Sequence, residues 1–393
     1  MLAIRVDAPR GVLGEEDELW QNKNMVKGAL ERWDVSDPTL NPGGIWNDVE
    51  IVVSGSARIA RTKIQAQPSE FPPIDRPNDP VRAVVAVEFE LDLIAGSVPT
   101  EYEIDIELLP VGDEKDVAVD ENQGRVRKTV SALLFPGTQT ERVIVQLDQA
   151  RLWWTWDLGT PQLYRLSLCL RSEDGVSDRM ETRFGIRQIE QREGSSLYLN
   201  NIRFFQRGAN YLSDQLLSRM THDRYKKDLA LVKEANLNTI HPFCILERQI
   251  FYDQCDEEGV LVYQDFPMWM TMSNESEFVR RAVAQVAEMT EQFGHHPSIA
   301  IWNMGSQPSP ANFEKLNSAL VYTVKQADPS RIVKQGNASV AFEGNPVHSH
   351  GSFFWDPALL EQYAQVFDWR SDLHLYFGWY MGEKEDLAQM PDS

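Results

Sequence analysis

Alternation of apolar and polar positions dominates the first half of the chain. Residues 81–93, 102–109, 142–147 and 163–170 alternate or run apolar, with turn residues between them. A period of two is typical of strands that bury one face. The spacing over residues 55–187 predicts an immunoglobulin-like β-sandwich. Three tryptophans, Trp153, Trp154 and Trp156, precede a Gly-Thr-Pro turn, and we expect them to close one edge by packing.

From residue 188 the pattern changes to strands alternating with helices. Apolar runs predict strands at residues 202–208, 237–243, 260–265, 299–304, 331–335 and 372–377, and helical stripes fall at 221–234, 248–258, 275–293 and 311–327. Thr221 is a good N-cap, Asp223 suits the first turn, and Gly259 ends the second helix. This order predicts a (β/α)8 barrel, which needs about 250 residues and eight strands. Six strands predict an incomplete one.

Residues 1–54 contain few strands. Leu2, Ile4 and Val6 alternate with polar neighbours, and Gly43 and Gly44 form a turn before a strand at residues 45–53. So short a segment makes a poor core by itself, so it reads as the C-terminal part of a larger β-domain. The expected fold is therefore multidomain, β plus α/β, with domains at 1–54, 55–187 and 188–393.

Composition and charge limit the classes of binding partner that are expected. The 59 acidic residues against 38 basic ones give a net charge of −21, which disfavours nucleic acid and anionic membranes. The cysteines at 169, 244 and 255 lack CxxC spacing, so neither a disulfide framework nor a zinc site is indicated, and no cofactor is expected. Without a run of about 18 apolar residues or a visible signal peptide, the expected location is the cytoplasm.

The most informative motif is residues 294–307, GHHPSIAIWNMGSQ. It predicts a helix end, a buried strand and a loop that reaches Gln307. The segment resembles the acid/base strand of family 2 glycoside hydrolases, which include β-galactosidases, β-glucuronidases and β-mannosidases. In that family a His-Pro-Ser sequence and an apolar strand with Trp lead to Gly-Asn-Glu, whose Glu donates the proton. Gln307 stands at the position of this Glu.

Other segments resemble the same family in the same order along the chain. Residues 4–7, 18–20, 27–28 and 43–49 are similar to the closing strands of its N-terminal sugar-binding jelly roll, and residues 163–164 and 184–187 to the end of its immunoglobulin-like domain. Residues 205–210, 251–267, 372–376 and 378–380 resemble barrel strands, most closely those of the β-mannosidase branch. The resemblance implies a partial jelly roll, a sandwich and an incomplete barrel.

The resemblance also implies a sugar site for a β-linked glycoside. Gln307 holds the acid/base position, and the nucleophilic Glu of strand seven is expected beyond Ser393. The expected substrate-binding residues are His241, Asp265, Trp302, Asn303, His374, Tyr376 and Trp379. His241 stands where the family usually has Arg. Asp265 could accept from a sugar hydroxyl or hold a polar neighbour, and Trp302 could be a core residue or a sugar platform.

Retaining glycosidases need two carboxyl groups about 5–5.5 Å apart, one as nucleophile and one as acid then base. An amide holds hydrogen bonds but neither gives nor takes the proton. The sequence therefore predicts no turnover by this chain alone. Three interpretations stay open: an incomplete β-glycosidase, a sugar-binding pseudoenzyme and a structural module. In the first, a complementing chain or a second copy would cover the open barrel edge.

Overall fold

The structure is a computed structural model of the 393-residue chain. It describes residues 4–6, 26, 28, 44–45, 47–112, 125–192, 196–269, 272–306 and 313–336. The jelly-roll interpretation of residues 1–54 falls mostly outside these ranges, and the predicted strand at 372–377 falls wholly outside them. The strand expected at residues 45–53 is not formed, since residues 47–53 have no strand partner among the described residues and residues 48–53 are exposed.

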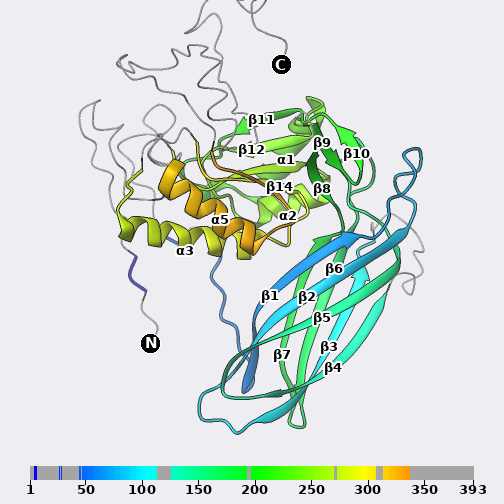
Figure 1. Cartoon of the computed structure of the whole chain (residues 1–393), viewed down its shortest axis with the longest axis vertical. Coiled ribbons are helices and arrows are strands. Elements are labelled where there is room, and N and C mark those ends of the chain that lie inside the picture. The colour runs from blue at the N-terminus through cyan, green and yellow to red at the C-terminus, as the bar shows by residue number, and fades with distance from the viewer. Residues whose placement is uncertain are drawn as a thin grey trace, which may run out of the picture.

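The alternating half of the chain forms two packed antiparallel sheets (Figure 1). One has the order β1 (Ala57–Pro68), β2 (Val81–Leu93) and β5 (Gly137–Ala150). The other has the order β4 (Val126–Leu134), β3 (Thr100–Pro110), β6 (Leu163–Ser172) and β7 (Gly175–Gly185). Along β2 every second side chain is buried, from Val81 to Leu93. The predicted sandwich is confirmed.

Between sandwich and barrel lies a small antiparallel sheet that the sequence pattern did not indicate. It contains β8 (Ile189–Arg192), β9 (Ser196–Leu199) and β10 (Ile202–Phe204). Asn200 and Asn201 have φ angles of 48° and 67°, a backbone that asparagine tolerates, and this turns the chain tightly from β9 into β10. The prediction of a first barrel strand at residues 202–208 was therefore wrong, because the hairpin takes its first half.

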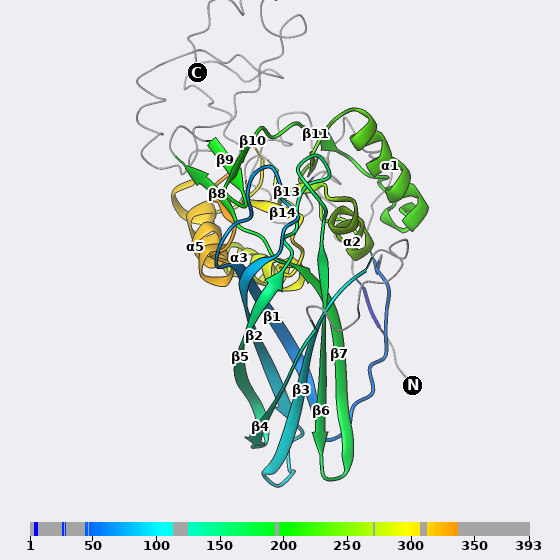
Figure 2. The ribbon, with the colours of Figure 1, turned by 90° about the vertical axis from the view of Figure 1, so that its right-hand side faces the viewer.

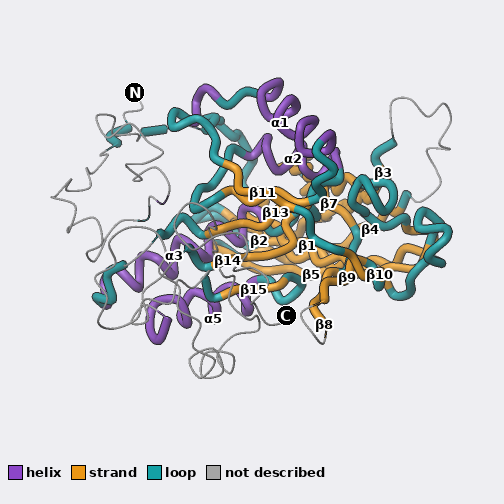
Figure 3. The backbone as a smooth tube through the Cα atoms, turned by 90° about the horizontal axis from the view of Figure 1, so that it is seen from above, coloured by secondary structure: helices purple, strands orange, loops and turns teal. Residues whose placement is uncertain are grey.

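Five parallel strands form the barrel part, in the order β11 (Gly208–Tyr211), β12 (Thr239–Pro242), β13 (Leu261–Asp265), β14 (Ile299–Asn303) and β15 (Ile332–Lys334). Between them run α1 (His222–Glu234), α2 (Gln249–Glu258), α3 (Ser276–Phe293) and α5 (Ser318–Ala327), with short turns η4 (Leu217–Arg219) and η5 (Phe313–Asn317). Figures 2 and 3 show α1 with α2, and α3 with α5, along the sheet. The predicted alternation of strands and helices is confirmed for the described residues, which form part of a barrel.

Local signals place the helix ends as expected. The hydroxyl of Thr221 accepts from the Arg224 backbone N–H and caps α1, whose first turn contains Asp223. Gly259 ends α2 with a φ of 67°. A Cβ at Gly259 would lie 2.7 Å from the backbone nitrogen of Trp156, so glycine also allows the sandwich to approach.

Apolar packing is continuous from the sandwich into the barrel. One core joins sandwich residues to β8 and β9 and to Leu261, Tyr263, Ile301 and Ile332 on one face of the parallel sheet. On the opposite face, Val262, Trp302 and Val333 pack with residues of α2, α3 and α5. The inner face of the barrel therefore shares its core with the sandwich.

The tryptophan run fixes this junction. The indole N–H of Trp153 donates to the Asp256 carbonyl at 2.9 Å, and that of Trp156 donates to the Leu237 carbonyl at the same distance. Trp154 donates to Pro77 within the sandwich. The expected packing role of these tryptophans is confirmed. In addition, Trp153 and Trp156 join the sandwich to the barrel, because their acceptor carbonyls belong to the barrel part of the chain.

The chain before the sandwich touches the barrel in two described places. Arg248 pairs with Asp48 at 3.0 Å. At Gly28, whose φ is 54°, an added Cβ would lie 1.8 Å from the carbonyl oxygen of Cys244. Only glycine fits so close to another backbone. Among the described helices, none is long and apolar enough to span a membrane.

Candidate functional site

Polar side chains form a row at the carboxyl ends of the parallel strands. Neighbouring strands place Asn210 beside His241, Asp265 beside Asn303, and Asn303 beside Lys334. Parallel strands end at one edge, and barrel sites lie there. We call Asn210, His241, Asp265, Asn303 and Lys334 the polar row. It lies above Tyr263 and Ile301 of the shared core.

Asp265 holds the row together. Its Oδ1 accepts from Asn303 Nδ2 at 2.6 Å and lies 2.9 Å from Nε2 of His241. Its Oδ2 accepts from the backbone N–H of Cys244 at 2.9 Å and lies 3.4 Å from that thiol. The residue is 0% exposed. Of the two roles open from sequence, the structure assigns Asp265 that of holding polar neighbours; a contact with sugar stays a prediction.

Three buried polar atoms near the row have no hydrogen-bond partner among the described residues. They are Oδ1 of Asn303, Oγ of Ser306 and Nε2 of His241, whose contact with Asp265 lacks hydrogen-bond geometry. Buried polar groups are normally satisfied, because an unmade hydrogen bond costs about 1–3 kcal/mol. Such atoms at a strand end are suited to bind the hydroxyl groups of a ligand.

His241 lies in an aromatic and polar setting. Its Nδ1 is 2.8 Å from Oδ1 of Asn210, and its ring lies 4.4 Å from that of Tyr263. Its ring also meets the edge of Phe243 at 5.8 Å. These contacts orient the imidazole, which is 14% exposed. His241 is therefore held in one orientation at the carboxyl end of β12, and its contact with sugar stays a prediction.

Sequence reasoning missed several residues of the site. Lys334 is buried at the end of β15, with Nζ 4.9 Å from the centre of the Tyr263 ring. Phe243, Cys244 and Trp269 form a small apolar cluster in the loops after β12 and β13. Trp269 pairs with Ser306 in a parallel bridge. Each follows or ends a predicted strand, and this position was the available signal.

Trp302 points away from the row. Its indole N–H donates to Asp328 at 2.9 Å, and the side chain is fully buried in the core beneath α3 and α5. Of the two roles open from sequence, the structure therefore supports the core role. The physical reason is alternation: Ile301 and Asn303 face the inside of the barrel, so Trp302 between them must face the helices.

The motif leading to Gln307 is described up to Ser306. Gly305 has a φ of 101°, and a Cβ there would lie 2.9 Å from the Met268 carbonyl oxygen, so the turn after β14 requires glycine. Gln307 lies outside the described residues, as do His374, Tyr376 and Trp379. Their assignments stay predictions.

A second buried carboxyl group, that of Glu247, lies in the loop after β12. One oxygen accepts from the Tyr225 hydroxyl at 2.7 Å, and the Ser213 hydroxyl also favours the ionised form of the carboxyl group. Burial raises the pKa of Glu247 to about 7, against the Tyr225 hydrogen bond that lowers it. The folded state thus favours the protonated acid.

Replacing Glu247 by Gln should raise the free energy of unfolding at pH 8 by about 1–3 kcal/mol. Between the ordinary pKa of 4.5 and the folded-state value of about 7, the folded chain holds a proton that the unfolded chain has released. The wild type therefore loses stability as pH rises through this window, and the Glu247→Gln variant should not. Urea denaturation at pH 4.5 and pH 8 measures the difference.

The exposed Glu234 provides the control, because Glu234→Gln removes the same charge from the surface of α1. It should change stability by under about 0.5 kcal/mol at both pH values. An equal gain from Glu247→Gln at both pH values would contradict the raised pKa.

Known proteins resemble this chain in sequence and in structure. The model for "Glycosyl hydrolases family 2" matches residues 78–187, and the model for "Glycosyl hydrolases family 2, TIM barrel domain" matches residues 189–374. β-Mannosidase B of Neosartorya fischeri is 28% identical over 316 residues, covering 77% of this chain and 34% of that protein. A mannosylglycoprotein endo-β-mannosidase of Lilium longiflorum is 26% identical over 346 residues, covering 81% and 34%.

Solved structures agree on the fold. The β-D-mannosidase of Dictyoglomus thermophilum has a TM-score of 0.60 at 22% identity, covering 72% of this chain and 35% of that one. A β-glucuronidase of Bacteroides uniformis has a TM-score of 0.63 at 17% identity, covering 86% and 40%. The chain belongs to glycoside hydrolase family 2. It spans about a third of the length of the curated relatives named above.

Proposed function

We propose that this chain forms the sugar-binding half-barrel of a retaining β-glycosidase of the β-mannosidase type. The observation that carries the proposal is the set of buried polar atoms in and beside the polar row that lack a hydrogen-bond partner among the described residues. They are Asn303 Oδ1, Ser306 Oγ and His241 Nε2. Ser306 directly precedes the acid/base position in the chain. The relatives named as β-mannosidases support the sugar class.

Chemistry at position 307 limits the proposed activity. Gln307 can hold a substrate oxygen by its amide but cannot protonate a leaving group. General acid/base catalysis contributes about 10²–10⁴-fold, and without the nucleophile there is no covalent route at all. We therefore propose that the chain alone binds a β-mannoside without turning it over. The expectation that a complementing chain or a second copy covers a barrel edge belongs to this proposal.

The test combines binding with turnover. Titration calorimetry with methyl β-mannoside and methyl β-galactoside measures binding by the full chain, and release of an activated aryl β-mannoside alcohol measures turnover. His241→Ala should weaken mannoside binding at least about tenfold, because it removes a polar contact at the row. The control His222→Ala changes an exposed histidine at the start of α1.

The outcomes separate the interpretations. Binding that His241→Ala weakens and His222→Ala spares, without turnover, agrees with the proposal. Turnover of the aryl mannoside would contradict the inactivity, and turnover that needs azide would identify an intact nucleophile beside a missing base. An absence of sugar binding would favour a structural module.

The alternative is a carbohydrate-binding pseudoenzyme, favoured by the amide at Gln307. The two proposals differ in what the longer protein does. A protein that includes this chain and a strand-seven Glu should hydrolyse activated aryl mannosides if it is a weakened glycosidase, and it should only bind them if it is a pseudoenzyme.

A further inference from the structure

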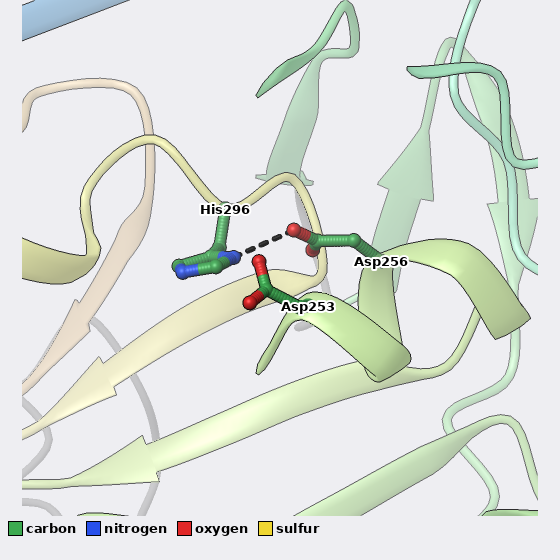
Figure 4. A group of neighbouring side chains, drawn as sticks. All are labelled: Asp253, Asp256 and His296. Atoms are coloured by element: carbon green, nitrogen blue, oxygen red, sulfur yellow. Dashed lines mark hydrogen bonds and ion pairs between the residues drawn. The ribbon is translucent and has the colours of Figure 1, made fainter. Parts of the chain in front are cut away.

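Away from the polar row, three side chains with metal-ligating atoms converge at the opposite end of the sheet. Asp253 and Asp256 lie three residues apart on α2, and His296 precedes β14 (Figure 4). One ligand atom from each lies within 4.8 Å of the others. Asp256 Oδ2 is 2.6 Å from His296 Nδ1, and both side chains are almost fully buried, while Asp253 is 33% exposed.

A buried serine lies next to this cluster. Ser298 is 0% exposed, and its Oγ has no hydrogen-bond partner of good geometry among the described residues. The backbone N–H of Ser298 donates to Oδ1 of Asp256 at 3.0 Å, which places Ser298 next to that carboxyl group.

We propose that Asp253, Asp256 and His296 form a binding site for Zn²⁺ at the junction of the sandwich and the barrel. Imidazole nitrogen and carboxylate oxygen both bind zinc, and imidazole favours zinc over magnesium or calcium. At zinc–ligand distances of about 2.0–2.2 Å, bound atoms lie roughly 3.3 Å apart, so the 2.6 Å contact between Asp256 and His296 lengthens when the ion enters past Asp253. The solvent-exposed edge of Asp253 supplies the entry path.

The neighbours of His296 can accommodate the proton that zinc binding displaces from the imidazole ring. Nδ1 now faces Asp256, and Nε2 lies 2.6 Å from Nε2 of Gln249. When zinc takes the Nδ1 lone pair, the imidazole proton moves to Nε2, and the Gln249 amide turns its oxygen to accept it. A metal-bound histidine needs such an acceptor on its other nitrogen. Any proton on Asp256 is released to solvent.

Arg183 is the competing partner and can remain bound elsewhere. It lies 3.4 Å from Asp253 and also pairs with Glu257. When Asp253 turns to zinc, Arg183 keeps its partner Glu257. The bound ion would then join α2 to the start of β14, beside the carbonyl of Asp256 that Trp153 binds. The site therefore stabilises the domain junction and takes no part in sugar chemistry.

The test uses the full chain after chelator treatment. Equilibrium dialysis with zinc and metal analysis should find one tight zinc per chain, and zinc should raise the melting temperature by at least about 2 °C. Asp253→Asn should weaken zinc binding at least about tenfold, because the amide is a poor ligand. It should leave the metal-free melting temperature nearly unchanged, because Asp253 is partly exposed.

Glu257→Gln is the matched control, since it removes the other carboxylate that pairs with Arg183 and should leave zinc affinity unchanged. Cobalt(II) in place of zinc should give a spectrum without the intense thiolate band, which excludes Cys255 and the other cysteines. Zinc binding that survives Asp253→Asn, or no zinc bound by the folded wild type, would overturn the proposal.

Discussion

Replacing Asp265 by Ala should lower the free energy of unfolding by about 3–5 kcal/mol. The carboxylate accepts from Asn303 and from the Cys244 backbone, and it lies 2.9 Å from His241. Without it, these donors remain buried without their acceptor, because the residue is 0% exposed and water does not replace it. Urea denaturation followed by tryptophan fluorescence measures the loss.

Two comparisons separate this effect from a general loss of charge. Asp174→Ala removes a carboxylate from the exposed turn between β6 and β7, so it should cost under about 0.5 kcal/mol. Asp265→Asn keeps one accepting oxygen and should fall between wild type and Asp265→Ala. A cost below about 1 kcal/mol for Asp265→Ala would mean that the polar row does not depend on this carboxylate.

Trp153→Ala should cost a similar amount, about 3–5 kcal/mol, and should loosen the junction between sandwich and barrel. The side chain is fully buried in the shared core and gives its indole N–H to Asp256. Gly185 allows the chain to pass so closely that a Cβ there would lie 2.7 Å from Pro297 and 2.9 Å from Trp153. Neighbours packed this tightly leave a cavity rather than collapsing.

Trp153→Phe distinguishes the two contributions. It keeps most of the volume and loses chiefly the indole N–H, so it should cost about 1–2 kcal/mol. Limited proteolysis should cut Trp153→Ala, and not Trp153→Phe, between the two domains. Tyr322→Ala, at a side chain 68% exposed on α5, should have almost no effect. Equal losses for all three variants would exclude a specific junction.

Hydrophobic periodicity predicted the strands that bury one face and the helices whose ends are marked by a capping residue. β2 alternates from Val81 to Leu93 and was found with the same bounds, and Thr221 and Gly259 placed the ends of α1 and α2. β1 was missed because a bulge between Ile59 and Arg61 breaks its alternation, and β4 and β7 because charged residues interrupt their apolar face. The hairpin of β9 and β10 depends on two asparagines with positive φ, which composition does not reveal.

The site was predicted from the family resemblance and from strand ends. His241, Asp265 and Asn303 were expected from the family resemblance, Asp265 also from its place at a strand end, and the structure brings them together. Trp302 could not be oriented from sequence, because all five residues of β14 are buried and no alternation distinguishes the faces. Asp256 and His296 are 40 residues apart, so only the packing of α2 against the start of β14 brings them together.

The bond from Trp153 to Asp256 also sets an order of events during synthesis. The acceptor lies 103 residues after the donor. At about 5–20 residues per second, the ribosome takes roughly 5–20 seconds to make that length. The sandwich strands up to Gly185 are synthesised before α2. Trp153 and its neighbours therefore stay exposed to solvent until α2 leaves the ribosome. A nascent chain of intermediate length therefore exposes an apolar, tryptophan-rich surface that chaperones can bind. Slower translation through α2 would lengthen this exposure.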